Sequence, residues 1–94
     1  MEKKSTPVPK RISSDQIRAG RALIRWSAAD LAREANLGLA TVRRAEVADG
    51  TTSMTTANEL AVRRALEAAG VEFIDENGGG PGVRLRKQGS EPGS

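Results

Sequence analysis

Arginine supplies most of the side chains in this sequence that could take part in binding chemistry. The chain has 15 basic and 12 acidic residues, and arginine outnumbers lysine. Two arginines, Arg43 and Arg44, are adjacent and follow the small and apolar segment 39–42. A guanidinium group can donate two parallel hydrogen bonds to a phosphate or to atoms O6 and N7 of guanine. The composition therefore favours nucleic acid as a partner, although a solvated surface of mixed charge has much the same composition.

Several kinds of chemistry require residues that the sequence lacks. Without cysteine the chain has no disulfide and no thiolate, and without histidine it lacks the commonest metal ligand and general base. We therefore predict no enzyme activity, no catalytic residues, no metal site and no cofactor. No apolar run approaches the roughly 20 residues that cross a bilayer, and the N-terminal MEKKSTPVPKR lacks the apolar core of a signal peptide. We expect a cytoplasmic protein without membrane contact.

The two arginines belong to a segment whose pattern predicts two short helices. Ser27 is a good N-cap, and small or apolar residues recur after it at helical spacing up to Ala35. The residues at 36–38 (Asn-Leu-Gly) are typical of a tight turn, since Asn and Gly tolerate non-helical backbone. A second helix is predicted over 38–48. Two helices joined by so short a turn form a helix-turn-helix.

Helices are also predicted on both sides of this segment. Ser13 and Gln16 form a capping box that opens a helix ending before Ser27. Thr56 and Glu59 form a similar box, which opens a helix that stops at Gly70. In that last helix, acidic and basic residues at i, i+4 spacing predict an exposed polar face. It is made of Glu59, Arg63 and Glu67.

The C-terminal part changes from helical to strand-like composition. Residues 71–75 and 83–86 are strand-like around a turn rich in Gly, and they predict a short β-hairpin or strand pair. We divide the chain into a disordered basic arm (1–12), a helix-turn-helix domain (13–70), a strand segment (71–86) and a disordered tail (87–94). The predicted fold is mainly α, a compact bundle of four to five helices followed by the strands.

The helix-turn-helix segment resembles the DNA-binding core of the phage-repressor/Cro family, often called XRE, in its small bacterial single-domain subset. The resemblance extends from Gln16 to Gly70, and it implies a lambda-repressor-like arrangement of the helices. Matching positions in and around the two helices are Ser27, Leu31, Ala32, Ala35, Leu37, Thr41, Val42 and Glu46.

The resemblance implies a regulator of transcription that binds a double-stranded DNA operator. Residues of the second helix would enter the major groove, where Leu39, Ala40 and Arg44 occupy base-reading positions and Arg43 lies beside them. Leu39 and Ala40 offer only apolar contact, so polar readout falls on Arg44 and Thr41. The remaining positions implied to lie near DNA are Ser27, Thr51 and Thr52.

The chain departs from the family pattern at three turn or cap positions. Asn36 replaces the usual turn glycine, an acceptable change because Asn adopts the left-handed backbone more readily than most residues. Gly38 replaces the usual Ser or Thr cap. Arg25 stands where the family commonly has glycine; it either takes the left-handed conformation, at a cost on the order of 1 kcal/mol, or the helix ends in another way.

The resemblance also implies an ion pair between Arg21 and Glu46, and a homodimer. Such proteins usually bind two half-sites that are roughly 34–36 Å apart, which requires a two-fold axis. We expect the strand segment to form the dimer contact, although packing on its own domain is an alternative. The candidate dimer residues are Val71, Phe73, Ile74, Val83 and Leu85.

A second class of function fits the same scaffold. The chain would then be a protein-interaction module, such as an antiactivator or an antitoxin-like protein, that binds a regulatory protein partner. A recognition helix with few polar base-reading residues favours this alternative, and the arginines oppose it.

Overall fold

Four helices and a two-stranded antiparallel hairpin make up the described part of the chain, which comprises residues 11–48 and 54–87 of a computed structural model. The predicted mainly helical domain with a C-terminal hairpin is therefore confirmed. None of these helices combines the length and the apolar character that a membrane span requires. The elements are α1 (Ser14–Leu23), α2 (Ala28–Ala35), α3 (Leu39–Val47), α4 (Thr56–Ala68), β1 (Val71–Ile74) and β2 (Gly82–Leu85).

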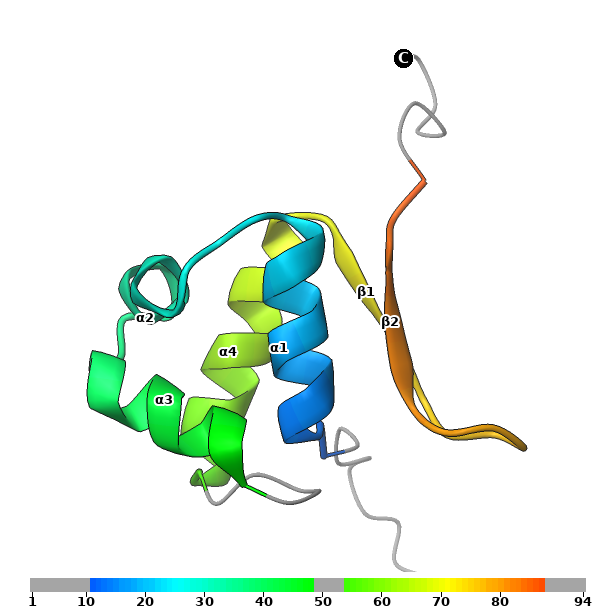
Figure 1. The fold of residues 1–94 in the computed structure, drawn as a ribbon, viewed down its shortest axis with the longest axis horizontal. Helices are drawn as coiled ribbons and strands as arrows, with labels where there is room; N and C mark the ends of the chain where they lie inside the picture. The colour runs from blue at the N-terminus through cyan, green and yellow to red at the C-terminus, as the bar shows by residue number, and fades with distance from the viewer. Residues whose placement is uncertain (1–10, 49–53, 88–94) are drawn as a thin grey trace, which may run out of the picture.

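Helices α1 and α4 lie side by side at the centre of the molecule (Figure 1). Helices α2 and α3 pack on one side of this pair, and the hairpin packs on the other. The core between them is mainly aliphatic. Its fully buried side chains include Ile17, Leu31, Val42, Val62, Leu66 and Val71.

Local sequence signals set the ends of the first two helices. The box of Ser13 and Gln16 is present at the start of α1. Ser27 caps α2 as predicted, and Asp30 completes a second box there. Both helices end in the same way: the backbone turns left-handed (φ 60°) at Arg25 and at Asn36. Such turns let the backbone N–H groups beyond a helix satisfy its last carbonyl groups.

The hydrogen bonds at these two ends follow one pattern. Trp26 N donates to Arg21 O at 3.0 Å, and Leu37 N donates to Ala32 O at 2.8 Å. In each case the apolar residue after the left-handed residue packs against the core. The sequence left the conformation of Arg25 open; the structure shows the left-handed alternative.

Two expectations about α4 were wrong. Its N-cap is Thr55, whose hydroxyl accepts from Asn58 N at 3.1 Å, and not Thr56. Glu59 is only 5% exposed and accepts hydrogen bonds from Arg11 Nε at 3.0 Å and from Ile12 N at 2.9 Å. The face predicted to be exposed therefore begins with a buried carboxylate.

Arg63 and Glu67, the other two residues of that face, also contact neighbouring side chains. Arg63 lies over the Phe73 ring, 5.1 Å from its centroid, and its Nε donates to Glu67 at 3.1 Å. At the N-terminal end, Ile12 is buried in the core. The boundary predicted between residues 12 and 13 is therefore too late, because Arg11 and Ile12 are fixed to α4.

The hairpin packs on its own domain. Val71 pairs with Leu85 and Phe73 with Val83, and both β1 residues point into the core. Gly20 of α1 faces this contact: a Cβ atom there would lie 3.4 Å from the side chains of Leu66 and Val71, at the short end of ordinary van der Waals distance. Val71 and Phe73 were predicted to contact a second copy, and this prediction is corrected because their side chains are buried within one chain.

Candidate nucleic-acid interface

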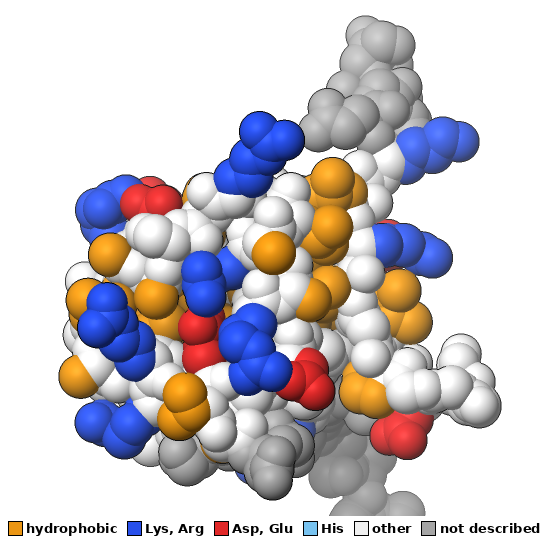
Figure 2. Space-filling model, in the orientation of Figure 1, with side chains coloured by type: hydrophobic (Ala, Val, Ile, Leu, Met, Phe, Trp, Pro, Cys, Tyr) orange, Lys and Arg blue, Asp and Glu red, His pale blue; other side chains and the backbone are white. Residues whose placement is uncertain are grey.

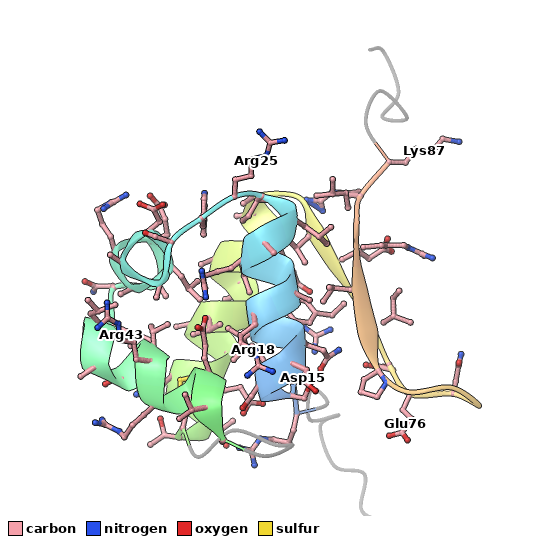
Figure 3. All side chains as sticks on the ribbon, viewed as in Figure 1. Asp15, Arg18, Arg25, Arg43, Glu76 and Lys87 are labelled. Carbon is pink, nitrogen blue, oxygen red and sulfur yellow. The ribbon has the colours of Figure 1, made fainter. Side chains whose placement is uncertain are left out.

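The outward face of α3 is the surface on which most of the predicted site residues meet. Ala40, Arg43, Arg44 and Val47 are exposed and recur at helical spacing i, i+3, i+4 and i+7. Together with the half-buried Leu39 they line a shallow, open hollow. Basic and hydrophobic side chains gather over α3 in Figure 2, and Figure 3 marks Arg43 among them.

This face of α3 carries positive charge, and no acidic residue in the described part of the chain pairs with it. Within residues 11–48 and 54–87, neither Arg43 nor Arg44 forms an ion pair. The helix has a single acidic residue, Glu46, and it is buried on the opposite side. By contrast, Arg33 of α2 and Arg84 of β2 pair with carboxylates.

Glu46 is held by Arg21 of α1 in the ion pair that the resemblance implied. Arg21 Nε lies 2.6 Å from Glu46 Oε2, and Nη2 lies 2.8 Å from Oε1. The third guanidinium nitrogen, Nη1, donates to Trp26 O at 2.9 Å. The hydrogen bond to Glu46 raises the pKa of Arg21 above its ordinary value. The pair joins the end of α1 to the end of α3.

Two further side chains of α1 bind the last turn of α3. Ser14 Oγ donates to Ala45 O, and Arg18 Nη1 donates to Glu46 O. The last carbonyl groups of a helix have no partner inside it, and α1 supplies partners for two of them here. These roles of Ser14 and Arg18 were not predicted, because no local pattern in the sequence shows which helix the two side chains contact. Together with Arg21 they fix the orientation of α3.

The N-terminal end of α3 has no side-chain cap. Gly38 is its N-cap and offers no side-chain hydrogen bond, as the sequence predicted. Thr41 is half buried and lies outside the line of exposed residues, so its predicted outward position is only partly correct. Leu39 packs partly against the core. The first turn of α3 therefore exposes mainly Ala40.

Ser27 lies at the start of α2, and its groups are used within the protein. Its Oγ accepts from Asp30 N at 3.0 Å, and its N–H donates to Asp30 Oδ2 at 2.9 Å. This backbone hydrogen bond, followed by that from Arg33, lowers the pKa of Asp30 below its ordinary value. The structure thus shows a capping role for Ser27. Thr51 and Thr52 lie outside the described residues.

Val47 belongs to the outward face of α3, although it was not among the predicted site residues. Its side chain is 80% exposed, the highest value among the exposed large apolar residues of the described chain. The signal was present in the sequence, because Val47 follows Ala40, Arg43 and Arg44 at spacings of seven, four and three. Comparison of the chain with protein-family models and with curated proteins found no match.

Proposed function

We propose that this protein is a sequence-specific regulator of transcription that inserts α3 into the major groove of double-stranded DNA. The observation that carries the proposal is an outward helix face with two arginines and no carboxylate. An α-helix with its side chains is about 10–12 Å across, and the major groove is about 12 Å wide. A regulator of this kind would act in the cytoplasm.

The positions of the exposed residues around α3 suggest which parts of the DNA they would contact. Successive residues are about 100° apart around a helix, so Ala40 and Val47 follow one line along it. Arg43 and Arg44 project on either side of that line. One guanidinium group can therefore approach base edges while the other approaches a phosphate.

Within this arrangement, Arg44 is the principal base-reading residue. It lies one helical turn after Ala40 on the exposed face, and its fork fits guanine O6 and N7. Ala40, Leu39 and Val47 provide apolar contact, for instance to thymine methyl groups. The rigid attachment of α3 through Arg21 and Glu46 supports this role, because base readout needs a helix held in one orientation.

A binding experiment with matched variants tests the proposal. Sites should first be selected from a pool of random duplexes and compared with the DNA upstream of the protein's own gene. We expect tight, salt-dependent binding to the selected site. Arg44→Ala should lose about 1–3 kcal/mol there and relax the preference at one base position. Arg43→Ala should weaken binding to all sequences about equally if Arg43 contacts a phosphate.

Arg64→Ala is the matched control, because Arg64 is an exposed arginine on α4 and lies outside the α3 surface. It should leave both affinity and sequence preference nearly unchanged. Circular dichroism should show that every variant keeps the helical content of the wild type. The proposal is rejected if no sequence is enriched, or if Arg44→Ala binds the selected site as the wild type does.

A protein-interaction module remains the second candidate, and Val47 is the observation that favours it. An exposed valine beside Leu39 and Ala40, with two arginines at its flanks, also suits an acidic amphipathic helix from a protein partner. Under this alternative, DNA binding would be weak and independent of sequence. Val47→Asp would then abolish partner binding.

A further inference from the structure

Strand β2 has an open edge. In the described residues it pairs with β1 on one side, and no strand lies on its other side. Arg86 N donates to Gly70 O at 2.7 Å. Hydrogen-bonded and non-hydrogen-bonded pairs alternate along an antiparallel ladder, so the N–H and C=O groups of Val83 and Leu85 point toward the open edge.

Apolar side chains accompany this edge. Leu85 is 49% exposed, although it lies on the same face of the hairpin as the buried Phe73. Leu23, in the last turn of α1, is 39% exposed. It follows Gln16 by seven residues, so it shares the side of α1 whose Gln16 amide donates to Gly82 O of β2 at 3.0 Å. Hydrophobic side chains are visible between α1 and the hairpin in Figure 2.

The two ends of the hairpin carry opposite charge. The exposed acidic residues Asp75 and Glu76 follow β1 at the turn, and the exposed basic residues Arg86 and Lys87 follow β2. Figure 3 shows Glu76 and Lys87 at opposite ends of the hairpin. Between them, the charge of Arg84 is balanced by Glu72 across the ladder, with 2.9 Å between Nε and Oε1.

We infer that the open edge of β2 binds the β2 strand of a second copy, in antiparallel orientation about a two-fold axis. The two hairpins then form one four-stranded sheet. Antiparallel pairing brings the basic end of each β2 next to the acidic turn of the other copy, so the charge pattern complements itself. The open backbone edge at the half-buried Val83 and the exposed Leu85 becomes paired. This removes an unpaired strand edge, which otherwise favours unwanted association.

This inference does not depend on DNA binding, and sedimentation without DNA tests it. The wild type should sediment as a dimer in the micromolar to millimolar range. A variant with Asp75→Lys and Glu76→Lys carries basic groups at both ends, and a variant with Arg86→Glu and Lys87→Glu carries acidic groups at both ends. Each alone should dimerise about tenfold or more weakly than the wild type. An equimolar mixture of the two should form a heterodimer, because every facing pair of ends is then opposite in charge.

Two further tests distinguish loss of strand pairing at the β2 edge from loss of the hairpin or a change in net charge. Val83→Pro removes an N–H that points away from β1, so it should weaken the dimer while the hairpin remains, and Val83→Ala keeps that N–H. Glu34→Lys, on the exposed side of α2, changes the net charge in the same direction as the Asp75→Lys and Glu76→Lys variant but by half as much, and it places the added charge away from the hairpin. The inference is wrong if the wild type is a monomer throughout, if the mixture does not associate, or if Val83→Pro dimerises normally. Association of the wild type only with added acidic peptides would also overturn it.

Discussion

At the scale of single residues, the Arg21–Glu46 pair is the contact on which the placement of α3 depends most. The Glu46 side chain is 8% exposed, and both of its oxygens accept from Arg21. Removing one member of a buried pair leaves the other charged and without compensation, which typically costs about 3–5 kcal/mol. We expect the loss here to lie near the lower figure, because Arg21 is partly exposed and also binds Trp26 O.

Denaturant unfolding of Glu46→Ala should therefore show a free energy of unfolding lower by about 3 kcal/mol. A double-mutant cycle with Arg21→Ala should give a coupling energy well above the roughly 0–1 kcal/mol of exposed pairs. The Arg33–Asp30 pair, whose members are three residues apart on α2, is the control. A coupling energy no larger than that of the control pair would show that Arg21 and Glu46 act independently.

Among side-chain contacts between distant parts of the chain, prediction succeeded where the partner was implied by the family pattern and failed at Glu59. The Arg21–Glu46 pair was expected from the resemblance. Glu59 was not, because a glutamate at i, i+4 spacing from an arginine has the same pattern on an exposed helix and over a buried backbone N–H. The partner of Glu59 includes Ile12 N, 47 residues away in sequence, and no local periodicity indicates that contact.

At the scale of the elements, α1 and α2 end in similar left-handed turns that are formed by different residues. Arg25 and Asn36 have the same φ of 60°. A residue with a Cβ atom is disfavoured in this conformation by roughly 1–2 kcal/mol, and Asn tolerates it better than Arg. The end of α1 therefore contains strain that the end of α2 largely avoids.

Arg25→Gly should relieve this strain and stabilise the protein. We expect a net gain of up to about 1 kcal/mol, since glycine also loses more conformational freedom on folding. Asn36→Gly should gain less, and Arg25→Ala should gain nothing because alanine keeps the Cβ atom. Thermal and denaturant unfolding of the three variants would measure the order. If Arg25→Gly and Arg25→Ala had equal effects on stability, the effect would come from loss of the arginine side chain and not from relief of backbone strain.

Element boundaries could be predicted where the signal is local. Ser13 with Gln16, Ser27, Asn36 and Gly38 each mark a helix end through their own neighbours in sequence. The start of α4 was misplaced by one residue because Thr55 and Thr56 are both capable caps. The packing of the hairpin could not be decided from sequence, since the same apolar strand residues suit a partner chain and the α1–α4 surface equally well.

At the scale of the whole molecule, the two proposed surfaces lie on opposite sides. Helix α3 is on one side of the central α1–α4 pair, and β2 is on the other (Figure 1). Dimerisation through β2 would thus leave both α3 faces free. It would also place them far from the two-fold axis, each separated from it by the width of its own domain.

This arrangement changes the operator that we expect. The family pattern implied half-sites about one helical turn apart, roughly 34–36 Å. A dimer joined at β2 should instead prefer half-sites spaced by about two helical turns or more, roughly 68–72 Å for two turns. The spacing must be a multiple of the DNA helical repeat, because only then do the major grooves of both half-sites face the same side of the duplex. Affinity for duplexes that carry two selected half-sites at increasing separations would measure the preference. The charge-reversed hairpin variants should bind each half-site normally and lose only cooperativity. A cooperative optimum at one turn would show that the DNA-bound dimer uses a contact other than the β2 edge.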